Sequence, residues 1–250
     1  CDYPSLTNAG GIFAALNAGV VTGNLTIEVT GDLLGELGTN TLNQQLEEGG
    51  GAGTYTVTIR PSGGAARLIQ SDLTTPAATA LINLNGADRV TIDGLNTGGN
   101  SLTIRNTSTA GSTVRFIADA SGNTLQNATV EGAVTSTTNG VVFLSTGTTT
   151  GNQNNTVANN TISARSDAAG VPANLIYSTG SSATIPNKTI SVTGNTLKNF
   201  TSNGISATSA GNEDWTISGN SIFQEAARTT SLTGISFNSR GTNTITLNTI

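Results

Sequence analysis

The chain has 250 residues, of which 31 are Gly and only 10% are charged, with a net charge of -5 and neither His nor Met. Without His and with a single Cys, it lacks the residues for a Cys/His zinc site, a Ser-His-Asp triad, a His general base or an internal disulfide, and its acidic balance predicts no nucleic-acid partner. A hydrophobic content of 35% is too high for disorder, and no apolar run reaches the roughly 18 residues of a membrane span, so we expect a folded segment without membrane insertion.

The first 53 residues differ from the rest and are expected to form an N-terminal cap and a first coil. Within them, residues 5–19 predict a short amphipathic helix in which Leu6, Ile12, Phe13 and Leu16 share one face. Such a helix would cover the open end of a repeat array, where strand edges are otherwise unpaired.

Residues 54–250 carry an internal repeat. Each copy has an apolar residue, four mostly small or polar residues, and a second apolar residue that closes the motif. The closing residues are Ile92, Val130, Ile162, Leu197, Ile222 and Ile250, and their spacing averages about 32 residues. Because the motif still runs at Ile250, we expect further coils beyond it.

A second apolar series lies between the closing residues. Its members are pairs two residues apart, which predicts short strands with both side chains on one face: Ile82 and Leu84, Val114 and Phe116, Val141 and Phe143, Leu175 and Tyr177, Ile205 and Ala207, and Ile235 and Phe237. Thr and β-branched residues dominate these segments, and Gly, Asn and Ser fill the connections. Short strands without a helix in the period predict an all-β parallel solenoid.

Asn recurs two residues before the closing apolar residue. The members of this series are Asn160, Asn195, Asn220 and Asn248. In a parallel coil they would stack about 4.8 Å apart, so we interpret them as a structural Asn ladder at a turn. A row of sugar-binding amides is the alternative. Asn85, Asn123, Asn155 and Asn243 form a second, broken series.

The repeat resembles a known module. The strings that carry the resemblance begin at Asn85, Phe116 and Phe143, together with the opening Asp2-Tyr-Pro-Ser-Leu. They are similar to the right-handed parallel β-helix modules of large secreted and surface proteins of Bacteroidota-type bacteria, which are adhesin-like and often use type IX secretion. The resemblance implies a right-handed parallel β-helix (solenoid) of about seven coils with a short N-terminal capping helix, extracellular or at the cell surface, with no catalytic residues.

One candidate metal site follows from the repeat. The position after the closing residue points outward and holds Asp93 and Glu131 in two copies that the spacing places next to each other. Two carboxylates in adjacent coils could bind Ca²⁺, which prefers oxygen ligands. Ion pairing with Arg89, Arg105 or Arg115 is the alternative, and otherwise we expect no cofactor.

Carbohydrate cleavage and ice binding are two further activities known for β-solenoids. A polysaccharide lyase or glycoside hydrolase needs a placed carboxylate pair, and the pairs Glu47-Glu48 and Glu213-Asp214 lie in loops. An ice-binding solenoid needs Thr-x-Thr at one position of every coil, whereas the strings near Thr56, Thr148 and Thr244 fall at different places. Trp215 lies opposite Ile190 of the preceding repeat, so we predict that it packs in the core.

The composition favours a structural or adhesive module that is part of a larger polypeptide. We expect it to contact glycans or surface proteins without chemistry of its own.

Overall fold

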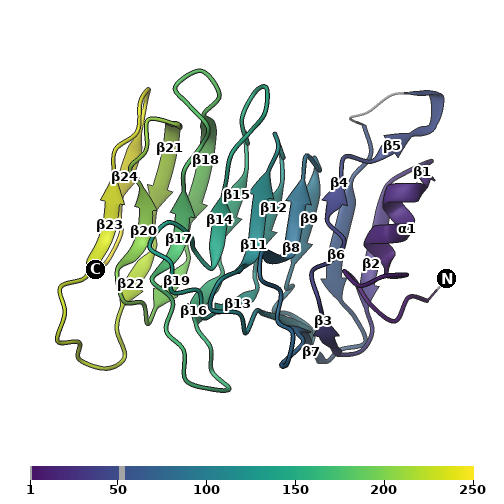
Figure 1. Ribbon diagram of the computed structural model, residues 1–250, viewed down its shortest axis with the longest axis horizontal. Coiled ribbons are helices and arrows are strands. Elements are labelled where there is room, and N and C mark those ends of the chain that lie inside the picture. The colour runs from purple at the N-terminus through teal and green to yellow at the C-terminus, as the bar shows by residue number, and fades with distance from the viewer. Residues whose placement is uncertain (1, 51–53) are drawn as a thin grey trace.

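The computed structural model describes residues 2–50 and 54–250 and forms an all-β parallel solenoid of about seven coils. The coils lie side by side along one long axis, with the helix at the N-terminal end and the C-terminus at the other (Figure 1). Each coil contributes a strand to each of three parallel sheets, here called sheets 1, 2 and 3. The predicted fold class is therefore confirmed, while the predicted boundary at residue 53 falls outside the described residues.

Sheet 1 has eight strands. They are β2 (Leu25–Val29), β6 (Val57–Pro61), β9 (Val90–Asp93), β12 (Thr124–Gln126), β15 (Thr156–Ala158), β18 (Asn187–Thr193), β21 (Asn212–Ser218) and β24 (Thr244–Thr246). β6 shows why these segments are strands: Val57 and Ile59 are buried, while Thr58 and Arg60 alternate with them on the outer face.

Sheets 2 and 3 have seven strands each. Sheet 2 comprises β3 (Leu33–Glu36), β7 (Ala66–Ser71), β10 (Ser101–Arg105), β13 (Thr129–Gly132), β16 (Thr161–Ala164), β19 (Thr196–Lys198) and β22 (Ser221–Phe223). Sheet 3 comprises β4 (Leu42–Asn43), β8 (Ala80–Asn85), β11 (Ser112–Ile117), β14 (Val142–Leu144), β17 (Asn174–Ser178), β20 (Asn203–Ala207) and β23 (Thr233–Phe237). Each strand pairs in parallel with its equivalent in the next coil, so the backbone groups of one coil satisfy those of its neighbours.

The helix of the N-terminal cap is shorter than predicted. Helix α1 covers only Ile12–Ala18, and residues 5–11 form turns held by the buried carboxylate of Glu36. That carboxylate accepts hydrogen bonds from the Leu6 and Thr7 amides at 3.0 and 2.6 Å. Leu6 and Phe13 are buried, so the cap does close the first coil. Beside it, β1 (Val20–Val21) pairs with β5 (Leu46–Glu47), which leads into the 3-10 helix η1 (Glu48–Gly50).

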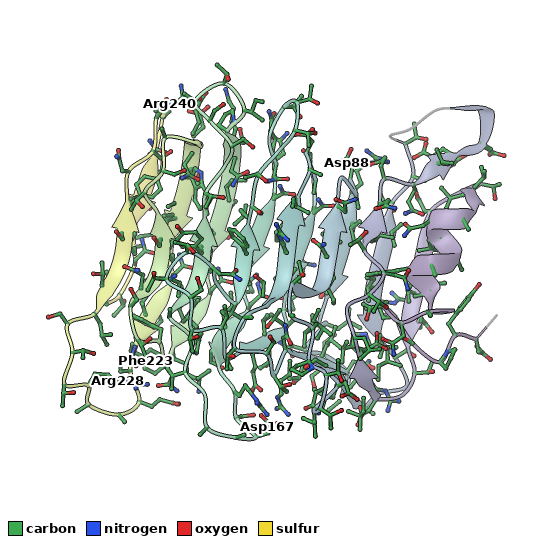
Figure 2. The ribbon with its side chains drawn as sticks, in the orientation of Figure 1. Asp88, Asp167, Phe223, Arg228 and Arg240 are labelled. Carbon is green, nitrogen blue, oxygen red and sulfur yellow. The ribbon has the colours of Figure 1, made fainter. Side chains whose placement is uncertain are left out.

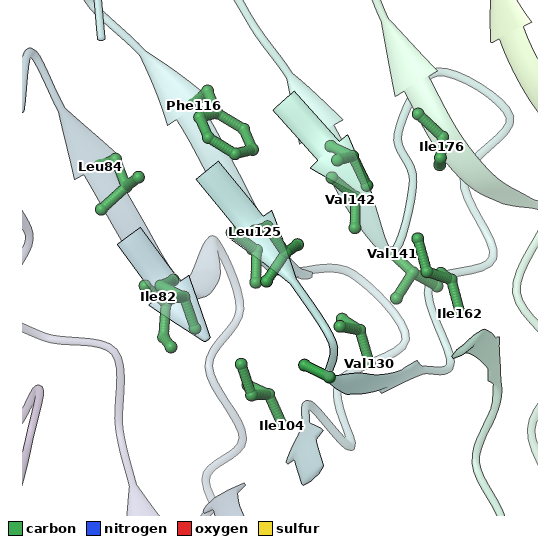
Figure 3. Packing of buried hydrophobic residues seen from close by; sticks show 14 of the residues in the cluster. Ile82, Leu84, Ile104, Phe116, Leu125, Val130, Val141, Val142, Ile162 and Ile176 are labelled. Carbon is green, nitrogen blue, oxygen red and sulfur yellow. The ribbon is translucent and has the colours of Figure 1, made fainter. Parts of the chain in front are cut away.

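The core is one continuous column of aliphatic and aromatic side chains inside the coils. Ile82, Val142 and Ile176 occupy equivalent inward positions on β8, β14 and β17 (Figure 3), and Val114 of β11 lies between the first two. Two of the predicted inward pairs are wrong by one residue, because Val142 with Leu144 and Ile176 with Ser178 are in register with the inward pair Val114 and Phe116, although Val141 and Leu175 are buried as well. In a strand, a shift of one residue moves a side chain to the opposite face, so Phe143 and Tyr177 point outward.

None of the helices in the described chain is long and apolar enough to cross a membrane.

Candidate functional site

The structure brings the four predicted Asn residues together at the corner between sheets 1 and 2. Asn160 donates its side-chain amide to the Asn195 carbonyl oxygen at 3.1 Å, Asn195 donates to Asn220 at 2.9 Å, and Asn220 donates to Asn248 at 2.9 Å. The first three are at most 2% exposed. Their amides are therefore used inside the fold, and the alternative of a sugar-binding row does not fit these three.

Each ladder side chain also forms hydrogen bonds with backbone groups that have no strand partner at the corner. Asn195 donates to the Val157 carbonyl of the preceding coil and accepts from the Asn160 backbone amide. The left-handed residue that turns the corner is the one before the ladder Asn, with φ between 56° and 66°: Asn159, Gly194, Gly219 and Leu247. The ladder residue itself thus serves hydrogen bonding, while its predecessor absorbs the turn.

The second Asn series is only partly a ladder. The Asn155 side-chain oxygen accepts the Asn123 backbone amide at 3.0 Å, and Asn243 accepts the amide of Trp215 at 2.9 Å. Asn85 lies elsewhere, in β8, and donates to Asn43. Trp215 is fully buried and pairs in register with Ile190, which confirms its predicted core position.

The two acids of the predicted calcium site lie in different sheets. Asp93 ends β9 in sheet 1, where its register partner is Gln126, whereas Glu131 lies in β13 of sheet 2 between Arg105 and Ser163. The prediction equated Ile92 with Val130, but Ile92 pairs with Leu125 and the counterpart of Val130 is Ile104. The two carboxylates do not form a pair, and the described residues contain no group of three or more metal-ligating His, Cys, Asp or Glu side chains.

Both acids are occupied within the fold. Asp93 accepts the side-chain amides of Gln126 and Asn127 at 2.8 and 2.9 Å. Glu131 is buried and pairs with the Arg105 guanidinium at 2.5 Å. For Glu131, the ion-pairing alternative is therefore the observed one.

The acid pairs considered for an enzyme do not lie in loops as predicted, because Glu47 ends β5 and Glu213 and Asp214 lie in β21. The buried Glu47 accepts the backbone amides of Thr54 and Tyr55 at 3.0 and 2.9 Å. Glu213 lies between Lys188 and Arg240, at 2.7 and 2.6 Å, beside a shallow polar hollow of about 420 Å³. Both carboxylates are therefore engaged within the fold, Glu47 with backbone amides and Glu213 with two cations.

Sheet 1 carries an outward column of hydroxyl groups that the sequence did not reveal. Its members are in register across all eight strands: Thr26, Thr58, Thr91, Thr124, Thr156, Ser191, Thr216 and Thr244. The neighbouring column begins with Glu28, Arg60, Asp93 and Gln126. Three charged residues and the Gln126 amide stand beside the hydroxyls in the first four coils, and they break the uniform Thr-x-Thr face that ice binding requires.

The outward face of sheet 3 carries a different set of residues, here called the outer row. It comprises the outward residues of successive strands from β8 to β20: Asn83, Arg115, Phe143, Tyr177 and Ser206. The rings of Phe143 and Tyr177 lie 5.6 Å apart at 51°, and the Arg115 guanidinium lies 5.5 Å from the centre of the Phe143 ring. The outer row therefore joins two aromatic faces to a cation on adjacent strands.

Arg115 is the unusual member of the outer row. It is partly buried and donates to the Ser145 hydroxyl at 3.0 Å, and burial lowers the pKa of its guanidinium. Its Nε atom is shielded from solvent and has no hydrogen-bond partner. The side-chain oxygen of Asn83, on the adjacent strand, is likewise shielded and without a partner. Burial also raises the pKa of Tyr177.

Comparison with protein-family models, with curated proteins and with solved structures finds no match to this chain. The parallel β-helix that the resemblance implied is the observed fold, whereas the bacterial group and secretion route remain predictions.

Proposed function

We propose that the chain is a structural and adhesive module of a large extracellular or cell-surface protein, and that it contacts glycans through the outer row of sheet 3. The observation that carries this proposal is the outward pair Phe143 and Tyr177. Both side chains are partly exposed on the outer face of the sheet, and the C–H face of a sugar ring can bind to an aromatic ring there.

The solenoid supports the structural part of this role. Internal ladders and a continuous core connect every coil to the next, so the body is a rigid rod that needs no disulfide. Strands of successive coils lie about 4.8 Å apart, so groups along the outer row form a linear array. Such an array suits weak contacts at several positions of an extended ligand, where avidity replaces a single tight site.

Glycan-array binding of the purified chain tests the proposal. We expect binding to be lost or reduced at least tenfold in Phe143→Ala and Tyr177→Ala. Phe223→Ala is the matched control, because Phe223 is 41% exposed on β22, the edge strand of sheet 2, whereas the outer row lies on sheet 3. Figure 2 shows Phe223 near the C-terminal coils. A chain that binds no glycan, or that loses binding equally in all three variants, would contradict the proposal.

The same preparation tests whether the module acts on what it binds. We expect polysaccharides to be recovered uncleaved, without new reducing ends or unsaturated products. Release of either product by the wild-type chain, abolished by Glu213→Gln, would instead support a carbohydrate-active enzyme.

A further inference from the structure

The pairing of the basic residues singles out Arg115. Of the ten Lys and Arg residues, these form ion pairs with carboxylates: Arg60, Arg89, Arg105, Arg165, Lys188, Lys198 and Arg240. Arg67 donates instead to the Ser62 carbonyl, and Arg228 is exposed to water at the lower edge of the coils (Figure 2). Within the described chain, Arg115 is thus the one partly buried cation whose only hydrogen bond is to a neutral hydroxyl.

A partly buried charge without a counter-ion is costly, because its lost hydration is not replaced. The guanidinium of Arg115 keeps donors free, and its Nε donor is hidden from water without a partner. An anion bound at this position would replace the water contacts that the Arg115 guanidinium loses on burial. A planar carboxylate matches the guanidinium fork with two parallel hydrogen bonds.

Resting on the proposed function, we infer that the outer row recognises an acidic glycan, with Arg115 binding the anionic group of one sugar and Phe143 and Tyr177 packing against sugar rings. The ligand class is a polysaccharide that carries carboxylates, such as a uronate polymer. Sulfate esters share the anionic chemistry, and the experiment separates the two sources.

Asn83 gives an independent indication of a ligand. Its side chain is 91% buried, since only 9% is exposed, yet its carbonyl oxygen has no donor. A buried acceptor that lacks a donor costs on the order of a hydrogen bond, and such groups are rare in folded proteins. Asn83 and Arg115 are register partners on adjacent strands, so a sugar hydroxyl next to the anion bound by Arg115 would supply that donor when the Asn83 side chain turns toward the surface.

The order of residues along the row fixes how the ligand lies. Asn83, Arg115, Phe143 and Tyr177 occupy four consecutive coils, so the polar pair is at the N-terminal side and the aromatic pair at the C-terminal side. An extended chain parallel to the solenoid axis can contact all four. A chain that runs parallel to the strands would contact only one coil.

The test is titration calorimetry with tetragalacturonic acid, its carboxyl-reduced neutral form and a sulfated neutral tetrasaccharide. We expect the acid to bind at least tenfold more tightly than its reduced form, and more weakly as salt rises. Arg115→Gln should remove the preference for the acid, whereas Arg60→Gln, an exposed and ion-paired cation on sheet 1, should retain it. Arg115→Lys keeps the charge but not the fork, and should bind the carboxylate less well than wild type.

The possible failures differ. Equal binding of acidic and neutral forms, or an acid preference retained in Arg115→Gln, overturns this inference and leaves the proposed function intact if Phe143→Ala still reduces binding. Tighter binding of the sulfated form than of the acid overturns the assignment to a carboxylate. No binding of any glycan by the folded wild-type chain overturns both proposals.

Discussion

Asn195→Ala tests whether the Asn ladder stabilises the solenoid. The side chain of Asn195 is 1% exposed and makes four contacts with good geometry. Its oxygen accepts the backbone and side-chain amides of Asn160, and its amide donates to the Val157 carbonyl and to Asn220. The substitution leaves the Asn160 backbone amide and the Val157 carbonyl as buried groups without these partners.

The cost can be worked out group by group. The Asn160 side chain retains its bond to the Leu125 carbonyl, and Asn220 still accepts the Asn195 backbone amide, so those two groups remain satisfied. Each of the two orphaned backbone groups costs about 1–3 kcal/mol. We therefore expect Asn195→Ala to lower the free energy of unfolding by about 2–6 kcal/mol.

The single Trp provides the assay. Trp215 is fully buried in β21, one coil after Asn195, so its fluorescence during guanidinium unfolding follows this part of the solenoid. The matched control is Asn248→Ala, because Asn248 is the partly exposed last rung and water can replace its bonds. We expect the control to lose about 1 kcal/mol or less. Equal losses in both variants, or no loss in Asn195→Ala, would refute the reasoning.

Three other substitutions probe the loops and the cap. Burial opposes ionisation of Asp119, but hydrogen bonds from the Thr148 hydroxyl and from loop amides outweigh it and lower the pKa from 3.8 to about 2. The stability from this carboxylate is complete above about pH 4 and is lost as pH falls through about 2, so between these values wild type should lose about 1 kcal/mol more than Asp119→Asn in acid titrations followed by circular dichroism. Glu36→Gln places an amide against the Thr7 backbone N–H, and amide hydrogen exchange at Leu6 and Thr7 should accelerate at least tenfold. Gly180→Ala should lower the melting temperature by several degrees, because φ is 61° and a Cβ atom would overlap the carbonyl of the next coil; an unchanged melting temperature would contradict this.

The coils and the Asn ladder could be predicted because their pattern is unambiguous. A polar residue alternates with apolar ones at Val57-Thr58-Ile59, which sets the phase of the strand. The phase of β14 could not be set in this way, since Val141-Val142-Phe143-Leu144 is apolar throughout and either alternation is compatible with a strand. Only the register with β11 decides it, and that register turns Phe143 outward.

The misplaced calcium site has a different cause. In most later coils, two residues connect a strand of sheet 1 to the next strand of sheet 2. After β9 the connection is longer and turns through Leu95 and Asn96, both at positive φ, before β10 begins at Ser101. The local motif around Ile92 therefore matches the closing motif in letters but belongs to another sheet. A longer connection of this kind moves the motif to a different sheet, while the residue types in the motif stay the same.

The Asn ladder and the outer row are under different structural constraints. A ladder Asn bonds to the coils before and after it, so its identity is set by both neighbours and a change is paid for in stability. An outward residue on sheet 3 does not have to bond to both neighbouring coils. The outer row accordingly changes from Asn to Arg, Phe, Tyr and Ser from one coil to the next. Binding groups can therefore occupy a few coils without weakening the rest. It follows that Phe143→Ala and Tyr177→Ala should reduce glycan binding while the guanidinium midpoint stays close to that of wild type, the reverse of what Asn195→Ala should do.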